Sequence, residues 1–227
     1  MVPKSRIDFN ARGKNILFSM DGKEISILVQ GVVQSTGSSL GWWVKQILGT
    51  DDFAGETSQD DIDHLGESPL IFYPHLTGDK TIYGDPNLRG AFLGMGTDTT
   101  RKEMTLAVME GICLAARQLA EVMCLTREEM DGLKVTGGGS KNEVWMQMLA
   151  DVLGVRVQQM ESTAGAGYGI TLAAAGSRDG VSMERMIDHT VRIRKTFSPR
   201  TYNMGLYEKK YKKYQKIYQC YQEMMEE

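Results

Sequence analysis

Three consecutive glycines, Gly137 to Gly139, constrain this chain more than any other feature of its sequence. A short β-type run with Leu133 and Val135 precedes them, and an apolar pattern typical of a helix follows up to Gly154. Glycines at a strand-to-helix turn let the backbone approach a ligand closely, because no Cβ stands in the way. The pattern therefore predicts an α/β unit whose turn can bind a nucleotide or a phosphate group.

The start of the following helix is also predicted from spacing. Ser140 and Glu143 have the Ser-x-x-Glu separation of a capping box, which places the helix start where the glycines end. The turn matches neither the Gly-x-Gly-x-x-Gly of dinucleotide folds nor a phosphate loop, since Ser140 precedes Lys141. Taken alone, a glycine-rich connection without a ligand is an equally good interpretation.

The composition is that of an ordinary globular chain, with 41% hydrophobic and 24% charged residues, so the chain can bury a core. The net charge of −3 gives no support to nucleic-acid binding, and no apolar run approaches the ~20 residues that span a bilayer. The N-terminus lacks the apolar core of a signal peptide. We therefore expect a cytoplasmic protein, with Cys113 and Cys124 as reduced core residues.

A second small-residue turn lies earlier in the chain. A strand over residues 24–33 is expected to pair with the short run 16–18 through a turn at Asp21-Gly22. Residues 34–39 then lead into a helix that begins near Leu40. The chain thus carries two turns of small residues that each join a strand to a helix.

The middle of the chain combines a long loop with its clearest helix. A strand at Leu70-Ile-Phe-Tyr73 precedes an irregular loop through Gly96, and loops of that length tend to be functional. Thr100 and Glu103 form a second capping box, and the apolar stripe beyond them is expected in the core. A further strand is expected at Val155-Arg-Val157.

The C-terminal tail carries a tyrosine stripe at helical spacing, surrounded by lysines. Such a stripe usually packs against its parent domain. Base stacking beside a basic groove is the less favoured interpretation. The tyrosines are Tyr207, Tyr211, Tyr214, Tyr218 and Tyr221.

Three ordered segments resemble the C-terminal domain of the FGGY carbohydrate kinases, most closely the xylulokinases. Thr136-Gly-Gly-Gly-Ser-Lys-Asn142 looks like the family's adenosine motif. Pro74-His-Leu-Thr-Gly-Asp-Lys-Thr81, continued through Asp85-Pro86 and Arg89-Gly90, is similar to a family loop. Ala107-Val-Met-Glu110-Gly111 is like the helix that the family places next.

The resemblance implies one actin-like, ribonuclease-H-like α/β domain over residues 1–227, with 1–12 disordered and a C-terminal amphipathic helix over 203–227. It implies that this domain binds ATP, with Mg²⁺, against a sugar-binding domain that precedes it and lies outside the chain. Gly138 and Asn142 match adenine-nucleotide contacts, within the glycine turn that also includes Gly137 and Gly139. Gly37 matches a glycine that approaches the phosphates.

The resemblance also has departures. Lys80 and Ile82 replace the family's arginine and proline, and Ala164 stands where the family has an acidic residue. The family's general base belongs to the preceding half, so we expect this chain alone to be inactive. Asp79 and Asp85, like Asp98, are expected to fix the loop or cap a turn.

Three functions remain open from the sequence. The leading one is the ATP-binding half of a kinase that phosphorylates D-xylulose. The second is a nucleotide-binding remnant or interaction module without kinase activity. The third is a kinase of the same family that acts on ribulose, gluconate or glycerol. The expected ligands are ATP or ADP and a sugar that the other domain binds. Neither nucleic acid nor a membrane is an expected partner. A homodimer is one option for assembly.

Overall fold

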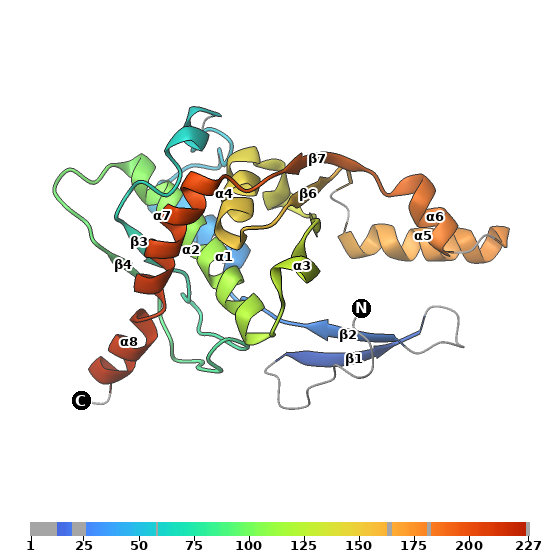
Figure 1. Ribbon diagram of the computed structural model, residues 1–227, viewed down its shortest axis with the longest axis horizontal. Coiled ribbons are helices and arrows are strands. Elements are labelled where there is room, and N and C mark those ends of the chain that lie inside the picture. Colours follow the sequence, from blue (N-terminus) through green and yellow to red (C-terminus); the bar gives the residue numbers. More distant parts are fainter. Residues whose placement is uncertain (1–12, 20–25, 58, 163–164, 181–182, 226–227) are drawn as a thin grey trace. The chain divides into compact units, whose positions relative to one another are not determined.

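The computed structural model describes residues 13–19, 26–57, 59–162, 165–180 and 183–225 (Figure 1). The chain divides into two compact units. The first comprises Met1–Asp51, Ser68–Thr126 and Lys210–Glu227, and the second comprises Asp52–Glu67 and Arg127–Lys209. The predictions for residues 1–12, for the turn at Asp21-Gly22 and for Ala164 lie outside the described residues.

The first unit is built on two antiparallel strand pairs and one long helix. β1 pairs with β2, with Lys14 opposite Gln30, which confirms the predicted pairing of these two runs (Figure 1). β3 pairs with β4. The elements are β1 (Lys14–Phe18), β2 (Ser26–Gln30), α1 (Thr36–Gly41), the π-helical η2 (Trp42–Ile47), β3 (Ile71–Tyr73), β4 (Ala91–Leu93), α2 (Arg101–Val122) and α8 (Ile217–Met225).

Helix α2 forms the centre of this unit. Its predicted capping box is confirmed, because the Thr100 hydroxyl accepts from the backbone N–H of Glu103 while the Glu103 carboxylate accepts from the backbone N–H of Thr100. The helix packs so closely on β3 that a Cβ on Gly111 would lie 2.2 Å from the carbonyl oxygen of Phe72. Glycine at this position therefore permits the helix to contact the strand backbone.

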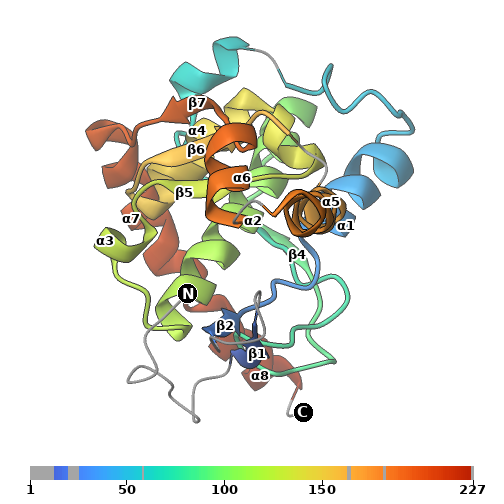
Figure 2. The same cartoon turned by 90° about the vertical axis from the view of Figure 1, so that its right-hand side faces the viewer.

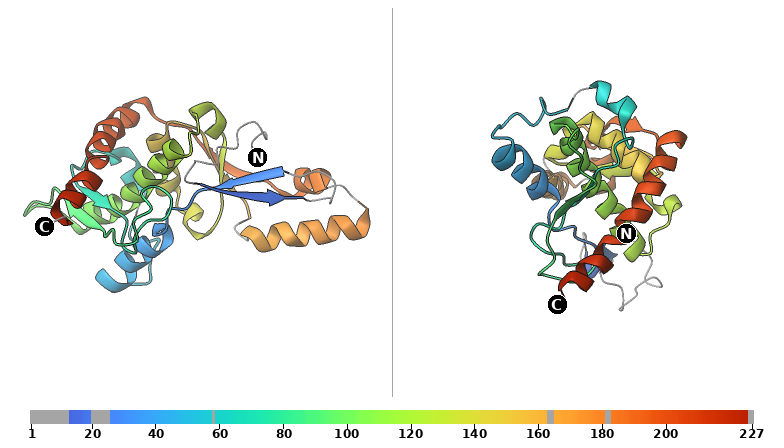
Figure 3. Two further views of the ribbon diagram at one scale, coloured as in Figure 1. Left: turned by 90° about the horizontal axis from the view of Figure 1, so that it is seen from below. Right: turned by 90° about the vertical axis from the view of Figure 1, so that its left-hand side faces the viewer.

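The second unit is a three-stranded sheet in the order β5-β6-β7, covered by α4 (Figure 2). β5 and β6 run parallel, whereas β6 and β7 are antiparallel. Helices α5 and α6 pack against each other (Figure 3). The elements are the 3-10 helix η3 (Gln59–His64), α3 (Arg127–Met130), β5 (Leu133–Val135), the 3-10 helix η4 (Gly138–Lys141), α4 (Glu143–Leu153), β6 (Val157–Met160), α5 (Gly165–Asp179), α6 (Met183–Thr190), β7 (Ile193–Phe197) and the part of α7 (Thr201–Tyr214) that ends at Lys209. The rest of α7 belongs to the first unit.

Several predicted bounds need correction. The strand expected over 155–157 begins only at Val157, since the chain leaves α4 through Gly154 in the left-handed conformation. The tail helix expected over 203–227 is two helices, α7 and α8. The helix expected near Leu40 already starts at Thr36. Cys124 is exposed with a φ of 55°, because it lies beyond the end of α2 and not in the core.

The tyrosine stripe packs inward, as predicted. In the first unit Tyr211 and Tyr214 are buried, and the Tyr211 hydroxyl donates to the Glu121 carboxylate over 2.6 Å. Not all of the surrounding lysines are solvated, however. Lys210 is buried and forms an ion pair with Glu110, which is also buried. The tail is therefore an integral part of the fold.

Among the described residues, the helices are too short or too polar to span a membrane.

Candidate functional site

The three glycines after β5 are glycine for different reasons. Gly137 has φ 101° and ψ 178°, a backbone conformation that residues other than glycine rarely adopt. A Cβ on Gly139 would lie 2.6 Å from the ring of Trp145, which is buried. Gly138 has neither constraint: its φ is not positive, and a Cβ there would meet no described atom within 4 Å. The fold therefore requires Gly137 and Gly139 but not Gly138.

The turn is held by buried polar contacts. The Ser140 hydroxyl donates to the carbonyl of Gly137 over 2.7 Å, and the side-chain amide of Gln159 on β6 donates to the carbonyl of Ser140 over 2.5 Å. Ser140 and Gln159 are both buried. These contacts tie the turn to the sheet, so its backbone is fixed before any ligand binds.

Asn142, and not Ser140, caps the N-terminus of helix α4. The predicted capping box at Ser140 and Glu143 is wrong, because one turn of 3-10 helix, η4, follows the glycines and delays α4 to Glu143. The side-chain oxygen of Asn142 accepts from the backbone N–H of Trp145 over 3.0 Å. Its amide nitrogen donates to the hydroxyl of Thr57 over 2.8 Å. Asn142 is thus oriented by contacts on both ends of its amide.

Gly37 lies in the first unit, within helix α1. A Cβ on this glycine would also meet no described atom within 4 Å, and its φ is not positive. Gly37 therefore shares with Gly138 the property that the fold does not require glycine there. The other predicted site residues, Gly137, Gly139 and Asn142, come together with Gly138 in the second unit.

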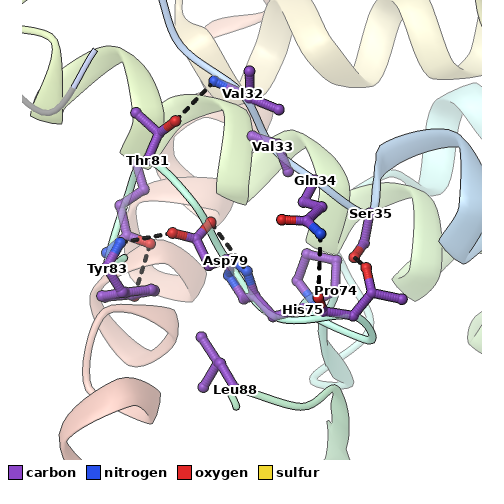
Figure 4. Close-up of polar contacts among 12 residues, drawn as sticks. Val32, Val33, Gln34, Ser35, Pro74, His75, Asp79, Thr81, Tyr83 and Leu88 are labelled. Atoms are coloured by element: carbon purple, nitrogen blue, oxygen red, sulfur yellow. Dashed lines mark hydrogen bonds and ion pairs between the residues drawn. The ribbon is translucent and has the colours of Figure 1, made fainter. Parts of the chain in front are cut away.

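The loop after β3 contains a buried polar cluster in the first unit (Figure 4). The imidazole Nδ1 of His75 lies 3.5 Å from a carboxylate oxygen of Asp79, and both side chains are buried. The other oxygen of Asp79 accepts from the backbone N–H groups of Tyr83, over 2.7 Å, and Gly84, over 3.3 Å. Burial lowers the pKa of His75 to about 4, and the Asp79 carboxylate opposes part of that shift.

The predicted structural roles of Asp79 and Asp85 are consistent with these contacts. Asp79 closes the loop from inside, and its carboxylate is not accessible to a substrate. The carboxylate of Asp85 accepts a hydrogen bond from the backbone N–H of Asn87 over 2.8 Å. The backbone carbonyl of Asp85 accepts one from the backbone N–H of Asp79. Asp98 is exposed on a turn.

Two residues that support the glycine turn carry no signal in the sequence. Thr57 lies in the segment 51–67, which has seven acidic residues and no Lys or Arg, a composition typical of solvated surface. Gln159 lies in a strand where a polar residue would ordinarily face solvent. Both contact the turn through side chains, over 85 and 19 residues of chain, and local spacing cannot reveal such contacts.

No group of three or more His, Cys, Asp or Glu side chains in the described parts of the chain could hold a metal ion. The described residues therefore offer no carboxylate cage for a divalent cation.

Comparisons with known proteins identify the family of the chain. Residues 20–177 match the C-terminal domain of the FGGY family of carbohydrate kinases. The xylulose kinase of Bacillus subtilis is 30% identical over 208 residues, which are 91% of this chain and 42% of that protein. Glycerol kinase 1 of Pseudomonas aeruginosa is 31% identical over 157 residues, which are 69% of this chain and 31% of that protein. The chain spans less than half the length of these relatives.

Solved structures show the same fold. The crystal structure of ligand-bound xylulose kinase from Lactobacillus acidophilus has a TM-score of 0.73 at 23% identity, covering 91% of this chain and 42% of that one. Plasmodium falciparum glycerol kinase with ADP has a TM-score of 0.69 at 17% identity, covering 90% and 41%. The predicted actin-like α/β fold is confirmed. The chain therefore belongs to the FGGY family of carbohydrate kinases, and its residues 20–177 correspond to the C-terminal domain of that family.

Proposed function

We propose that this chain is the ATP-binding half of an ATP-dependent sugar kinase, which transfers a phosphoryl group from ATP to a hydroxyl of D-xylulose. One observation carries the nucleotide assignment. Gly138 and Gly37 are glycines that the fold does not require, since a Cβ at either position would meet open space. Glycine at a helical position costs up to about 1 kcal/mol relative to alanine. Helical glycines elsewhere, such as Gly205, share this open environment, so it is the match of Gly138 and Gly37 to the family's nucleotide contacts that singles them out. Close approach of a ligand to the backbone is what glycine permits at these two positions.

The two glycines are assigned to different parts of the nucleotide. Gly138 and Asn142 match the family's adenine-nucleotide contacts, and Gly137 and Gly139 shape the turn around them. Gly37 matches the glycine that approaches the phosphates. Mg²⁺ is expected to enter with the phosphates, as it does at many kinase sites, and we assign it no ligand on this chain.

The sugar is proposed from the names of the relatives. Xylulose kinases are among the similar proteins, so D-xylulose is the first candidate. A glycerol kinase has similar identity, which keeps glycerol as an alternative substrate. Ribulose and gluconate remain alternatives on the family resemblance alone.

We further propose that the protein acts in the cytoplasm and that it forms homodimers, which light scattering after size-exclusion chromatography would test.

A nucleotide-binding module without kinase activity is the second candidate. It is favoured by the state of the loop carboxylates: Asp79 is buried and accepts two backbone hydrogen bonds, so it cannot serve as the base that deprotonates a sugar hydroxyl. The base must then come from elsewhere, and this chain by itself would bind ATP without turning it over.

Isothermal titration calorimetry with ATP and ADP tests the nucleotide assignment. Gly138→Ala should weaken binding, because a steric cost of about 1.4 kcal/mol at the ligand lowers the affinity about tenfold. Gly205→Ala is the matched control, since a Cβ there also meets open space and the residue lies in α7, outside the proposed site. Absence of ATP and ADP binding by the unmodified chain would falsify the nucleotide assignment.

Steady-state assays distinguish the two candidates. The longest reading frame that contains this chain is assayed with D-xylulose, ribulose, gluconate and glycerol, and kcat/KM is compared. The kinase proposal predicts the highest value for D-xylulose. ATP binding with no turnover of any of the four sugars would favour the binding module.

A further inference from the structure

We infer that the loop segment 74–81 positions the turn that carries Gly37, and that the hydroxyls of Thr77 and Ser35 are positioning groups for the phosphate side of the nucleotide. The inference rests on the proposed nucleotide function. Thr77 and Ser35 are not assigned any contact with the ligand. They position the backbone on either side of Gly37.

The turn and the loop share four hydrogen bonds through side chains, all within the first unit. Figure 4 shows those made by Val32, Gln34 and Ser35. The hydroxyls of Ser35 and Thr77 lie 3.0 Å apart, and the side-chain amide of Gln34 donates to the carbonyl of Thr77 over 3.3 Å. The Ser39 hydroxyl donates to the carbonyl of Pro74 over 3.0 Å. The backbone N–H of Val32 donates to the Thr81 hydroxyl over 3.1 Å. These bonds bracket Gly37 on both sides along the chain.

Because Ser35 and Ser39 are buried, their hydroxyls depend on these hydrogen bonds. Ser35 is 1% exposed and Ser39 is fully buried, so a hydroxyl that loses its partner here is not rescued by bulk water. Ser35 occupies the N-cap position of α1, yet its side chain makes no capping hydrogen bond. Its hydroxyl is committed to Thr77 instead. The position of the turn is therefore coupled to the position of the loop.

The loop is rigid enough to act as a support. A Cβ on Gly78, whose φ is +82°, would lie 2.5 Å from the carbonyl oxygen of Pro86, so the loop packs tightly on itself. The backbone N–H of Asp79 donates to the carbonyl of Asp85 over 2.8 Å. Together with the contacts of the Asp79 carboxylate, this closes the loop independently of any ligand.

The C-terminal helices hold the same loop. The Tyr214 hydroxyl lies 3.4 Å from Nε2 of His75, and the ring of Tyr218 stacks on Tyr83 with centroids 3.8 Å apart and planes at 19°. The Tyr221 hydroxyl donates to the carbonyl of Asn87 over 2.9 Å. The tyrosine stripe thus stabilises the loop, and the loop in turn holds the turn of Gly37.

The test separates the phosphate contribution from the adenosine contribution to binding. Affinities for adenosine, ADP and ATP are measured by calorimetry for the unmodified chain and for Thr77→Val, Ser35→Ala and Thr77→Ser. Loss of one hydrogen bond of this kind is expected to lower the ratio of ADP to adenosine affinity about 3- to 10-fold in Thr77→Val and Ser35→Ala. Thr77→Ser retains the hydroxyl and should restore the ratio. Thr171→Val, which removes an exposed hydroxyl on α5, should leave it unchanged.

Each outcome decides between the proposals. An unchanged ADP-to-adenosine ratio in both Thr77→Val and Ser35→Ala overturns the positioning role while leaving the nucleotide site intact. No binding of any of the three ligands by the unmodified chain overturns the nucleotide site itself. Hydrogen exchange gives a reading without ligand: amides of residues 36–40 should exchange faster in Thr77→Val, and unaltered exchange there counts against the coupling of loop and turn.

Discussion

Asn142 and Thr57, which lie 85 residues apart in the chain, are joined by a hydrogen bond of 2.8 Å from the asparagine amide to the threonine hydroxyl. The other end of the same amide caps helix α4. The residue that the family resemblance assigns to the nucleotide therefore also fixes the end of the glycine turn. Its substitution must be designed so that the effects on stability and on binding can be read separately.

Asn142→Ala removes both contacts of the amide. We expect the free energy of unfolding to fall by about 1–2 kcal/mol, because a helix cap and a side-chain hydrogen bond are lost. Asn142→Asp keeps an oxygen for the cap and one for the Thr57 hydroxyl, so it should unfold close to the unmodified chain while lacking the amide donor. Urea denaturation measures both, and equal stability of Asn142→Ala and the unmodified chain would contradict the structure.

The three turn glycines should give a fixed order of stability when each is replaced by alanine. Gly139→Ala is expected to cost about 1–3 kcal/mol, because its Cβ would overlap the Trp145 ring. Gly137→Ala is expected to cost about 1–3 kcal/mol through backbone strain. Gly138→Ala should be neutral or slightly stabilising. Urea midpoints provide the comparison, and destabilisation by Gly138→Ala equal to the other two would show that the fold requires all three.

Stability should depend on the protonation of His75. Burial lowers its pKa in the folded chain to about 4, against about 6.5 for an exposed imidazole, so the unfolded chain binds the proton first as the pH falls. The part of the free energy of unfolding that depends on a neutral His75 is therefore fully present above pH 6.5 and is lost between pH 6.5 and 4. One such group changes the free energy of unfolding by at most about 1.4 kcal/mol per pH unit.

The measurement is urea denaturation at pH 7, 6 and 5. His75→Gln should show a shallower loss of stability over this range than the unmodified chain. His64→Gln replaces an exposed histidine and is the control for the loss of a histidine elsewhere in the fold. If the slope of His75→Gln matched that of the unmodified chain, the buried imidazole would not be the source.

The buried ion pair between Lys210 and Glu110 should behave as a unit. Lys210→Met removes the cation that faces a buried carboxylate, and the expected loss is about 3–5 kcal/mol. The double variant Lys210→Met with Glu110→Leu should recover most of this loss, because no buried charge is left without its ion-pair partner. Thermal unfolding of both variants checks the prediction, and equal loss in the two would contradict it.

The sequence could predict elements whose signal is local. The capping box at Thr100 and the inward tyrosine stripe depend on spacing within one helix, and both are confirmed. The cap of α4 could not be predicted, because Ser140 has the spacing of a cap but its hydroxyl is used by Gly137 in a 3-10 turn. The choice between Ser140 and Asn142 depends on Gln159 and Thr57, which only the folded chain brings near.

Burial of a charged tail residue was likewise beyond local patterns. Lys210 lies among lysines whose pattern is typical of a solvent-exposed helix face. Its ion-pair partner, Glu110, lies 100 residues earlier in the chain. The candidate site follows the same rule. Its glycines are visible as a run in the sequence, whereas the constraint on each glycine depends on the atoms that surround it in the folded chain.

The four glycines of the candidate site, Gly37 and Gly137 to Gly139, are subject to different evolutionary constraints. Gly137 and Gly139 are retained by any descendant that still folds, because the backbone and Trp145 demand them. A lineage that had ceased to use nucleotide could replace Gly138 and Gly37 by alanine and gain helix stability in doing so. This chain carries all four. On the proposed assignment, the second pair is a sequence marker that distinguishes family members selected for nucleotide binding from members selected only for their fold.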